Sequence, residues 1–282
     1  MFDRRGKNVE IFEDSIEWIK ENTNLQKALT RSIAEQKLYL EKNEIAVDAP
    51  LAKNSDLKVV VSKKRSFEAA SEYARAGKNV CVLNFASATN PGGGVTHGSS
   101  AQEEALCRCS TLYPCLNTKK FWDDFYGPHR KANNPLYNND CIYTPGVVVF
   151  KSDISFPKRM GEEDWYSVDV ITCAAPNLRE RPSNAMNPNA GTHAAKVTKN
   201  ELLELLEKRI EKIFTIAAQN GAEVLILGAF GCGAFCNPPE IVAQAFATVQ
   251  ERYSGSFATI EYAIYCRDYE TANYDEFCRI IK

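Results

Sequence analysis

Hydrophobic residues recur with a helical spacing in the first part of the chain. Between residues 8 and 45, isoleucines and leucines follow one another at steps of three to five positions among charged residues, which is the pattern of amphipathic helices. Thr23 or Asn24 is the predicted break between two such helices. We therefore expect residues 1–50 to form an N-terminal helical extension and residues 51–282 to form the main domain.

Strand and helix patterns alternate over the rest of the chain. Two runs, at residues 79–85 and 223–227, are continuously apolar, as is typical of strands buried on both faces. The alternation predicts an α/β fold with a mixed, largely parallel sheet and helices on both faces. The predicted strands are 58–61, 79–85, 141–143, 147–150, 168–174, 223–227 and 257–265, the predicted helices are 66–75, 101–113, 198–219, 239–253 and 271–281, and a long loop spans 175–197.

Charge and composition narrow the classes of function. The chain of 282 residues has 34 Lys and Arg against 36 Asp and Glu, a net charge of −2, so its overall charge does not favour binding to nucleic acid or to an anionic membrane. No apolar run reaches the ~18–20 residues of a spanning helix, and the first residues lack the apolar segment of a signal peptide. We expect a cytoplasmic, monomeric protein without membrane or direct nucleic-acid partners.

The cysteines predict reduced thiols more readily than disulfides or a metal site. Several of the 10 cysteines lie inside apolar runs, where thiols are usually buried and free. Zinc is the alternative, but Cys107-x-Cys109 and Cys232-x3-Cys236 lack the paired C-x2-C spacing of structural zinc sites, and the chain has only three histidines. We therefore expect neither a metal site nor a cofactor.

Two glycine-rich loops follow buried strands. One spans residues 84–95 and the other residues 228–239. Glycines allow backbone N–H groups to approach an anion closely, and a following helix adds its partial positive charge. Gly92–Gly94 alone would fit a plain tight turn equally well, but two such loops after equivalent strands favour a ligand site at the carboxyl edge of the sheet. Neither loop has the spacing of a P-loop or of a dinucleotide-binding motif.

The triplet Gln102-Glu103-Glu104 opens a predicted helix directly after the first glycine loop. Carboxylates at a helix start are favoured by the helix dipole, so capping is one interpretation. The alternative is catalytic, because neighbouring like charges and burial raise the pKa of a carboxyl group. A carboxylic acid that stays protonated near neutral pH is what glycosidic cleavage requires.

The segment 84–116 closely resembles the signature of the microbial-type poly(ADP-ribose) glycohydrolases. That signature is three glycines, six to eight residues and then Gln-Glu-Glu; here Gly92–Gly94 and Gln102–Glu104 are separated by seven residues. Residues 227–246 resemble the diphosphate-binding loop of the family, and residues 169–178 resemble an internal strand. The resemblance implies a macrodomain-like catalytic domain that hydrolyses poly(ADP-ribose).

The resemblance also implies roles for individual residues. Glu104 would be the catalytic acid, Glu103 would bind ribose hydroxyls as the second catalytic-site carboxylate, and Gln102 would order the loop. The substrate-binding residues so implied are, on one side, Gly92, Gly93, Gly94 and Val95, on the other side Gly231, Cys232, Gly233, Ala234 and Phe235, and, as ribose contacts, Asn84 and Asn90. Phe235 would pack on the distal ribose, whereas no adenine-stacking residue is assigned.

Three functions fit the resemblance. The first is exo-cleavage of poly(ADP-ribose), since no counterpart of the additional substrate-clasping segment of the longer eukaryotic enzymes is found. The second is hydrolysis of single ADP-ribose groups from proteins, for example from arginine. The third is a non-catalytic ADP-ribose reader, against which the intact Gln-Glu-Glu triplet counts. In each case the expected partners are ADP-ribose or ADP-ribosylated proteins. The loop at 184–193 is open to two interpretations, a cover for the ligand or a plain surface loop.

Overall fold

A seven-stranded sheet forms the centre of the molecule, for which a computed structural model describes residues 3–43, 57–184 and 186–281. The strand order is β1-β4-β5-β3-β6-β7-β2. The five strands from β5 to β2 run parallel, whereas β4 pairs antiparallel with β5 and β1 antiparallel with β4, so the predicted mixed, largely parallel sheet is confirmed. The strands are β1 (Lys37–Tyr39), β2 (Lys58–Ser62), β3 (Val80–Phe85), β4 (Cys141–Val149), β5 (Tyr166–Cys173), β6 (Val224–Leu227) and β7 (Thr259–Ala263).

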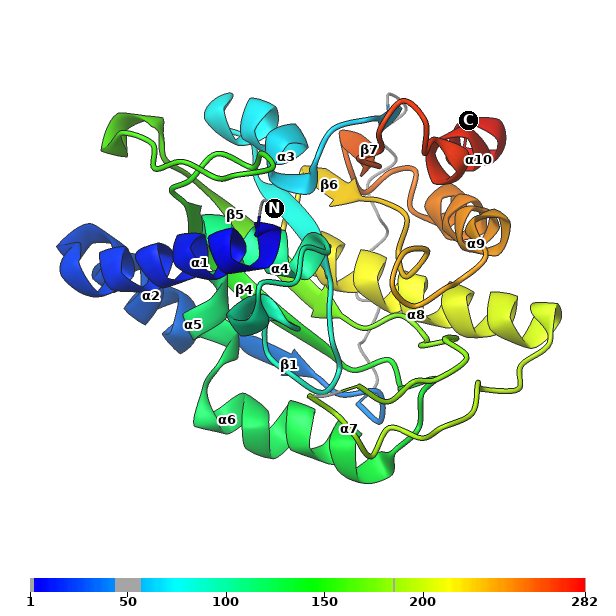
Figure 1. Cartoon of the computed structure of the whole chain (residues 1–282). Helices are drawn as coiled ribbons and strands as arrows, with labels where there is room; N and C mark the ends of the chain where they lie inside the picture. The colour runs from blue at the N-terminus through cyan, green and yellow to red at the C-terminus, as the bar shows by residue number, and fades with distance from the viewer. Residues whose placement is uncertain (1–2, 44–56, 185, 282) are drawn as a thin grey trace.

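Helices cover both faces of this sheet, as predicted (Figure 1). Successive side chains of a strand point to opposite faces, and on β3 Cys81 and Leu83 join one core cluster while Val80 and Val82 join the other. The first cluster is closed by α8 (Lys199–Gln219), α9 (Pro239–Arg252) and α10 (Ala272–Ile280). The second is closed by α3 (Ser66–Arg75), α4 (Gln102–Cys109), α5 (Leu112–Leu116) and Phe12 of the N-terminal helix.

The N-terminal segment forms two helices, α1 (Arg4–Glu21) and α2 (Thr23–Glu35). The side chain of Asn22 accepts hydrogen bonds from the N–H groups of Asn24 and Leu25, which is the capping geometry that starts α2. The break predicted at Thr23 or Asn24 is therefore confirmed. The predicted end of this extension near residue 50 lies outside the described residues.

The prediction that the helical region continues to residue 45 is wrong for residues 36–43, and residues 44–45 lie outside the described part of the chain. Gln36 has extended backbone, and residues 37–39 form β1, which pairs with Tyr143, Ile142 and Cys141 of β4. Pairing with a strand that lies about a hundred residues later in the chain, as that register shows, overrides the local helical spacing. Sequence spacing alone carries no information on such a partner.

Other boundaries also differ from the prediction. The helix predicted at 101–113 is interrupted at Ser110, whose extended backbone separates α4 from α5. The two strands predicted at 141–143 and 147–150 are one strand, β4, with a register shift between Thr144 and Val147. The prediction also missed α6 (Lys119–Phe121), a π-helical turn (Trp122–Tyr126) and α7 (Gly127–Ala132). Within the described part of the chain, no helix combines the length and the apolar character that crossing a bilayer requires.

Candidate active site

The two glycine loops leave the same edge of the sheet. They follow β3 and β6, which are adjacent and parallel, with Cys81 paired to Leu225 and Val82 to Ile226. At the base of the loops, the rings of Phe85 and Phe230 lie 5.8 Å apart. The prediction that both loops belong to one site at the carboxyl edge is consistent with this arrangement.

Both carboxylates of the Gln-Glu-Glu triplet point into the first loop. Glu103 is 3% exposed and accepts hydrogen bonds from the Ser87 N–H (2.7 Å) and from Nδ2 of Asn84 (3.3 Å). Glu104 is 7% exposed, and its Oε1 accepts a hydrogen bond from the Gly94 N–H at 2.9 Å. Since these bonds reach loop amides and not the first turn of α4, helix capping does not account for them.

Gln102 connects the start of α4 to the end of β3. Its Oε1 accepts a hydrogen bond from the Phe85 N–H at 2.9 Å, and its Nε2 donates to the Leu83 carbonyl at 2.8 Å and to Ser66 at 3.0 Å. Both ends of the amide are therefore used. This arrangement holds the loop and the helix in one position, as an ordering role requires.

Burial of the two neighbouring carboxyl groups changes the pKa of Glu103. Burial raises the pKa of Glu103 well above its ordinary value and the nearby Glu104 carboxylate raises it further, while hydrogen bonds from Ser87 and Asn84 lower it in part. Two buried carboxyl groups side by side favour holding a proton. The second oxygen of Glu104, Oε2, is buried without a hydrogen-bond partner among the described residues, so it is available to a ligand.

Gly93 lets the loop approach these carboxylates. Its φ is +56°, and an added Cβ would lie 2.6 Å from Oε1 of Glu104 and 3.0 Å from Oε2 of Glu103. Both the backbone conformation and the contact exclude a side chain at this position. A glycine is therefore required at position 93 because both carboxyl groups of the glutamate pair lie against its backbone.

The second loop is held mainly by Asn237, which the sequence analysis did not select. Its Nδ2 donates to the carbonyls of Pro176 (2.7 Å) and Gly231 (3.2 Å). Gly231 has a φ of +76° and lies so close to Ala175 and Asn237 that an added Cβ would be 2.5 Å from each. The Asn237-Pro-Pro sequence before α9 was the available signal, since an asparagine at the end of a glycine loop often holds backbone groups.

The remaining predicted site residues divide between the two loops. Asn84 is buried and also donates to Thr172 of β5 (3.2 Å), whereas Val95 is fully buried in the core below the first loop. In the second loop, Gly233 and Ala234 are exposed, and Cys232 and Phe235 are half-buried. Phe235 lies against Tyr137 (ring centroids 6.2 Å apart) and Arg179 (5.8 Å). Gly92 adjoins the Tyr113 ring, which is 2.7 Å from the position of an added Cβ.

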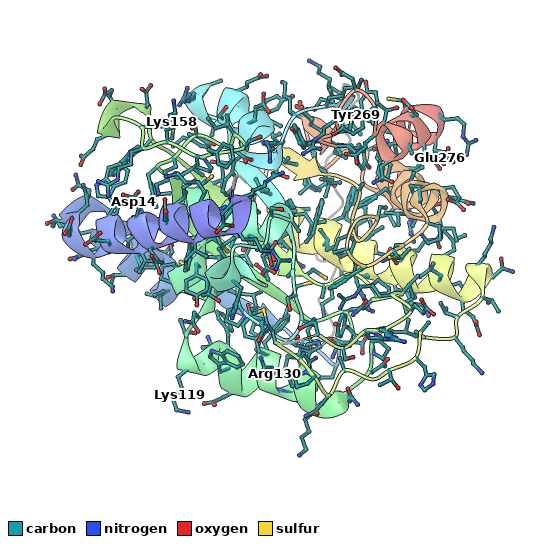
Figure 2. The ribbon with its side chains drawn as sticks, in the orientation of Figure 1. Asp14, Lys119, Arg130, Lys158, Tyr269 and Glu276 are labelled. Atoms are coloured by element: carbon teal, nitrogen blue, oxygen red, sulfur yellow. The ribbon has the colours of Figure 1, made fainter. Side chains whose placement is uncertain are left out.

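Asn90 is held by a residue that the sequence analysis missed. Its Oδ1 accepts a hydrogen bond from Arg130 of α7. The same guanidinium donates to the carbonyls of Thr89 (2.7 Å) and Met186 (3.3 Å) and lies over the Trp122 ring. Arg130 thus connects the first loop to the loop at 184–193, and Figure 2 labels it on α7. No sequence signal pointed to it, because its helical segment had not been predicted.

Exposed aromatic residues lie at the same edge, after β7. Tyr269 is 73% exposed and Tyr265 is 49% exposed, the two highest values for large hydrophobic residues in the described part of the chain. Both belong to the loop between β7 and α10, and β7 is parallel to β6. Figure 2 shows Tyr269 at the surface of this loop.

Metal ligation has no support in the residues that the structure describes. Among them, no group of three or more His, Cys, Asp or Glu side chains could hold a metal ion. All 10 cysteines are free and most are buried, as expected for reduced thiols. A cavity of about 690 Å³ lies at the opposite edge of the sheet, near Lys78, Val80 and Val168, and none of the predicted site residues lines it. The hydrogen-bonded carboxylates, and not this cavity, therefore mark the candidate site.

Comparison with known proteins agrees with this geometry. The sequence model of the family described as "Microbial-type PARG, catalytic domain" matches residues 10–152. No relative is found by sequence among curated proteins.

Solved structures of poly(ADP-ribose) glycohydrolase (PARG) are similar over nearly the whole chain. The enzyme from Thermomonospora curvata is 28% identical with a TM-score of 0.84, covering 98% of this chain and 100% of that chain. The same enzyme bound to the inhibitor ADP-HPD is 29% identical with a TM-score of 0.80, covering 98% and 99%. The enzyme from Deinococcus radiodurans in complex with ADP-ribose is 27% identical with a TM-score of 0.74, covering 90% and 96%.

The expected macrodomain-like α/β fold is therefore confirmed. The chain belongs to the family of microbial-type PARG catalytic domains, which are hydrolases of the glycosidic bonds of poly(ADP-ribose).

Proposed function

We propose that the chain releases ADP-ribose from poly(ADP-ribose) with Glu104 as both general acid and general base. The observation that carries the assignment is the state of the Glu104 carboxyl group. One oxygen is fixed by the Gly94 N–H at 2.9 Å, and the other is buried and without a partner among the described residues. A substrate oxygen is the natural partner for such a group.

The reaction follows from this arrangement. The bond to be broken joins C1″ of one ribose to an oxygen of the next unit, and that oxygen must gain a proton as the bond lengthens. Protonated Glu104 donates it, the ribose becomes oxocarbenium-like, and the resulting carboxylate takes a proton from the water that attacks C1″. The products are a free hydroxyl on the shortened polymer and ADP-ribose, and Glu104 is protonated again.

Glu103 has a different role in this proposal. Neighbouring residues of a helix point about 100° apart, so Glu103 and Glu104 are poorly placed to flank one bond as the two carboxylates of most glycosidases do. Glu103 lies between Ser87 and Asn84. We assign it to positioning of the distal ribose hydroxyls, together with Asn84.

The glycine loops supply the proposed diphosphate site. Residues 92–95 would wrap the diphosphate and distal ribose from one side, and residues 231–235 would do so from the other. The N–H groups of Gly93, Gly94 and Val95 are bonded within the protein, so the second loop would supply the N–H groups that bind the diphosphate. A site of this kind needs no lysine or arginine, which suits the net charge of −2. Binding of ADP-ribose by the Deinococcus radiodurans enzyme supports this ligand.

Tyr269 is our candidate for contact with the adenine. Its exposed ring lies at the same edge of the sheet as the glycine loops, with Arg267 5.7 Å from the ring centroid. A purine stacks favourably on such a ring. We expect Tyr269→Ala to weaken ADP-ribose binding about 5-fold, or ~1 kcal/mol, within the usual range for aromatic pairs, while leaving ribose 5-phosphate binding unchanged. Equal losses for both ligands, measured by calorimetry, would assign the adenine elsewhere.

We further propose that the protein acts as a monomer in the cytoplasm and cleaves the polymer from its ends. The turn after the glycine triplet is backed by α1, since an added Cβ on Gly98 would lie 2.3 Å from the Arg5 carbonyl. This contact holds the turn in place, and the support for exo-cleavage is the lack of a sequence counterpart to the substrate-clasping segment of the longer eukaryotic enzymes. The mostly buried free thiols suit a reducing, cytoplasmic compartment.

Glu104→Gln tests the central assignment. The glutamine amide is nearly isosteric with the carboxyl group but can neither donate nor accept the required protons. General acid–base catalysis typically contributes ~10²–10⁴-fold, and we expect the loss of turnover to lie at or above the top of that range because one residue supplies both steps. ADP-ribose binding should persist, because the loop amides that would bind the diphosphate remain in place. The measurements are release of ADP-ribose from automodified substrate and calorimetry with ADP-ribose.

Other outcomes of the same experiment separate the alternatives. Release of free ADP-ribose from the first time points on long polymer supports exo-cleavage, whereas early oligomers indicate internal cleavage. Release from mono-ADP-ribosylated arginine, and not from polymer, would establish the mono-ADP-ribosyl hydrolase. Stoichiometric binding without any release by the wild-type protein would establish the reader. Near-wild-type turnover by Glu104→Gln would refute the catalytic assignment.

A further inference from the structure

We propose that Asn8 of α1 is a positioning residue for Glu104, acting through the turn at residues 94–98; this inference rests on the catalytic role proposed for Glu104. Asn8 lies 96 positions before Glu104 in the sequence and has no place in the motif that carries the chemistry. Its contacts nevertheless lead to the catalytic carboxyl group in three hydrogen-bonded steps.

The first step joins α1 to the turn. Asn8 is 1% exposed, and its Nδ2 donates a hydrogen bond to the Gly98 carbonyl at 2.9 Å. Gly98 has a φ of +71°, and an added Cβ would lie 2.3 Å from the Arg5 carbonyl. The turn therefore lies directly against the first turns of α1, and only a glycine permits this approach.

The remaining steps run through the backbone of the turn. The Gly98 N–H donates to the Val95 carbonyl and the Ser99 N–H donates to the Gly94 carbonyl, both at 3.1 Å. The Gly94 N–H in turn donates to Oε1 of Glu104 at 2.9 Å. Gly94 thus lies between the part of the turn that α1 holds and the carboxyl group that the reaction uses.

A second residue of α1, Ser15, contacts the end of α4, beyond Glu104. The Ser15 hydroxyl donates to the Arg108 carbonyl at 2.7 Å, near the end of α4. Arg108 donates to the Ser99 carbonyl at 2.6 Å. Helix α1 therefore contacts the segment both before and after Glu104, as its position across α4 in Figure 1 indicates.

The position of α1 does not depend on Asn8. Lys151, which is 1% exposed, donates to the Ile11 carbonyl at 2.8 Å and pairs with Asp14 at 2.6 Å. Arg159 pairs with the same carboxylate at 2.6 Å. Asp14 projects from the middle of the helix (Figure 2). Loss of the Asn8 amide should therefore release the turn while α1 stays docked.

This independence makes a sharp experiment possible. Asn8→Leu removes the donor at similar volume, and Asn8→Asp keeps the shape but places an oxygen against the Gly98 carbonyl. We expect kcat on poly(ADP-ribose) to fall about 10-fold in both variants, since a misplacement of 1 Å can cost as much as ~10². KM should change less than 2-fold, because the second glycine loop is untouched.

Ile19→Ala is the matched control on the same helix. Ile19 is 4% exposed and packs with Leu25 and Phe150, away from the turn. This variant should lower Tm but keep kcat at a temperature where all variants are folded. Unchanged kcat in both Asn8 variants, or an equal loss of kcat in Ile19→Ala, would overturn the proposal. Should Asn8→Leu not fold, Asn8→Asp carries the test.

Glu104→Gln in the same assay separates this inference from the proposed function. If Glu104→Gln keeps its turnover, the catalytic assignment itself fails. If Glu104→Gln is inactive while the Asn8 variants turn over like the wild type, only the positioning role of Asn8 fails. Faster amide hydrogen exchange at Ser99 in Asn8→Asp, but not in Ile19→Ala, would show directly that the turn has been released.

Discussion

The two glycine loops lie side by side at one edge of the sheet, yet they are held in different ways. In the first, the carboxyl groups of Glu103 and Glu104 hydrogen-bond the N–H groups of Ser87 and Gly94. In the second, the Asn237 amide holds the base of the loop, and Gly233 and Ala234 at its tip are exposed. The first loop is therefore built around the two carboxyl groups, whereas we infer that the second loop would offer its backbone N–H groups to a ligand.

Because the loops are held differently, a glycine in the first loop and a glycine in the second need not tolerate a side chain equally well. At Gly93 an added Cβ would meet both carboxyl groups, whereas at Gly233 no atom of the described residues would lie within 4 Å of it. Gly93 also has a positive φ that other residues adopt only at a cost. The sequence shows a glycine in both places and does not distinguish them.

Between the two loops, the largest difference should be that between Gly93→Ala and Gly233→Ala. Gly93→Ala should lower kcat at least ~10²-fold, because the methyl group displaces the Glu104 carboxyl group from its position. Gly233→Ala should stay within 2-fold of wild type, since its Cβ enters open space. Steady-state kinetics on poly(ADP-ribose) measures both. Equal losses of kcat in the two variants would mean that a side chain is excluded equally from both loops, which would contradict the difference between them.

A smaller effect is expected at Asn237, the amide below the second loop. Asn237→Leu removes the side-chain donor to the buried Pro176 carbonyl, which should lower the free energy of unfolding by about 1–3 kcal/mol. The Gly231 carbonyl keeps the hydrogen bond from the backbone N–H of residue 237. We expect ADP-ribose affinity to fall about 10-fold, equivalent to ~1.4 kcal/mol, with kcat changed by less than 3-fold. Calorimetry and saturation kinetics separate the two quantities.

Asn220→Leu is the control for that experiment. Asn220 ends α8, where its Nδ2 donates to the Ile216 carbonyl at 2.7 Å, and it precedes β6 at the opposite edge of the sheet. Its replacement should cost stability but not ADP-ribose affinity. A loss of kcat in Asn237→Leu as large as the loss of affinity would contradict a purely binding role for the second loop.

The smallest effect concerns the pH dependence of stability. The pKa of Glu103 is raised above its ordinary value of 4.5, chiefly by burial, so the folded protein binds this proton more tightly than the unfolded chain. The free energy of unfolding should therefore fall as the pH rises above 4.5 towards the raised pKa. Glu103→Gln should flatten that fall, which urea unfolding at a series of pH values measures.

Glu201 provides a control of opposite sign. Its hydrogen bonds to the backbone and side chain of Thr198 lower its pKa, so its contribution is present above pH 4.5 and is lost as the pH falls through its lowered value. Glu201→Gln should therefore lower the free energy of unfolding by a constant amount above pH 4.5 and change its slope with pH only on the acid side. A Glu103→Gln profile parallel to wild type above pH 4.5 would contradict the raised pKa.

Much of the fold could be predicted because local patterns carry it. The alternation of strands and helices, the break near Thr23 and the helix at 66–75 depend on neighbours within a few residues, which the sequence displays directly. The helical segment at 119–132 was missed because a short helix, a π-helical turn and a helix with a proline in its first turn follow one another there. None of these has a long regular spacing of apolar residues.

The candidate site divides in the same way. The spacing of Gly92–Gly94 and Gln102–Glu104 identified the segment that bears the carboxyl groups, since this spacing lies within one short stretch of sequence. The contacts of Arg130 and Asn237 with the two loops could not be predicted from such spacing. Their roles depend on which carbonyls lie opposite them, at Thr89 and Pro176.

The α/β class, the two glycine loops and the glutamate pair follow from the sequence alone, because periodicity and short motifs are local properties of the chain. Three features follow only from the folded arrangement. These are that β1 completes the sheet, that α1 lies against the turn before Glu104, and that one oxygen of Glu104 is buried without a partner among the described residues. Each of these depends on atoms far apart in sequence brought within hydrogen-bond distance, where burial makes the pairing or isolation of a polar group energetically decisive.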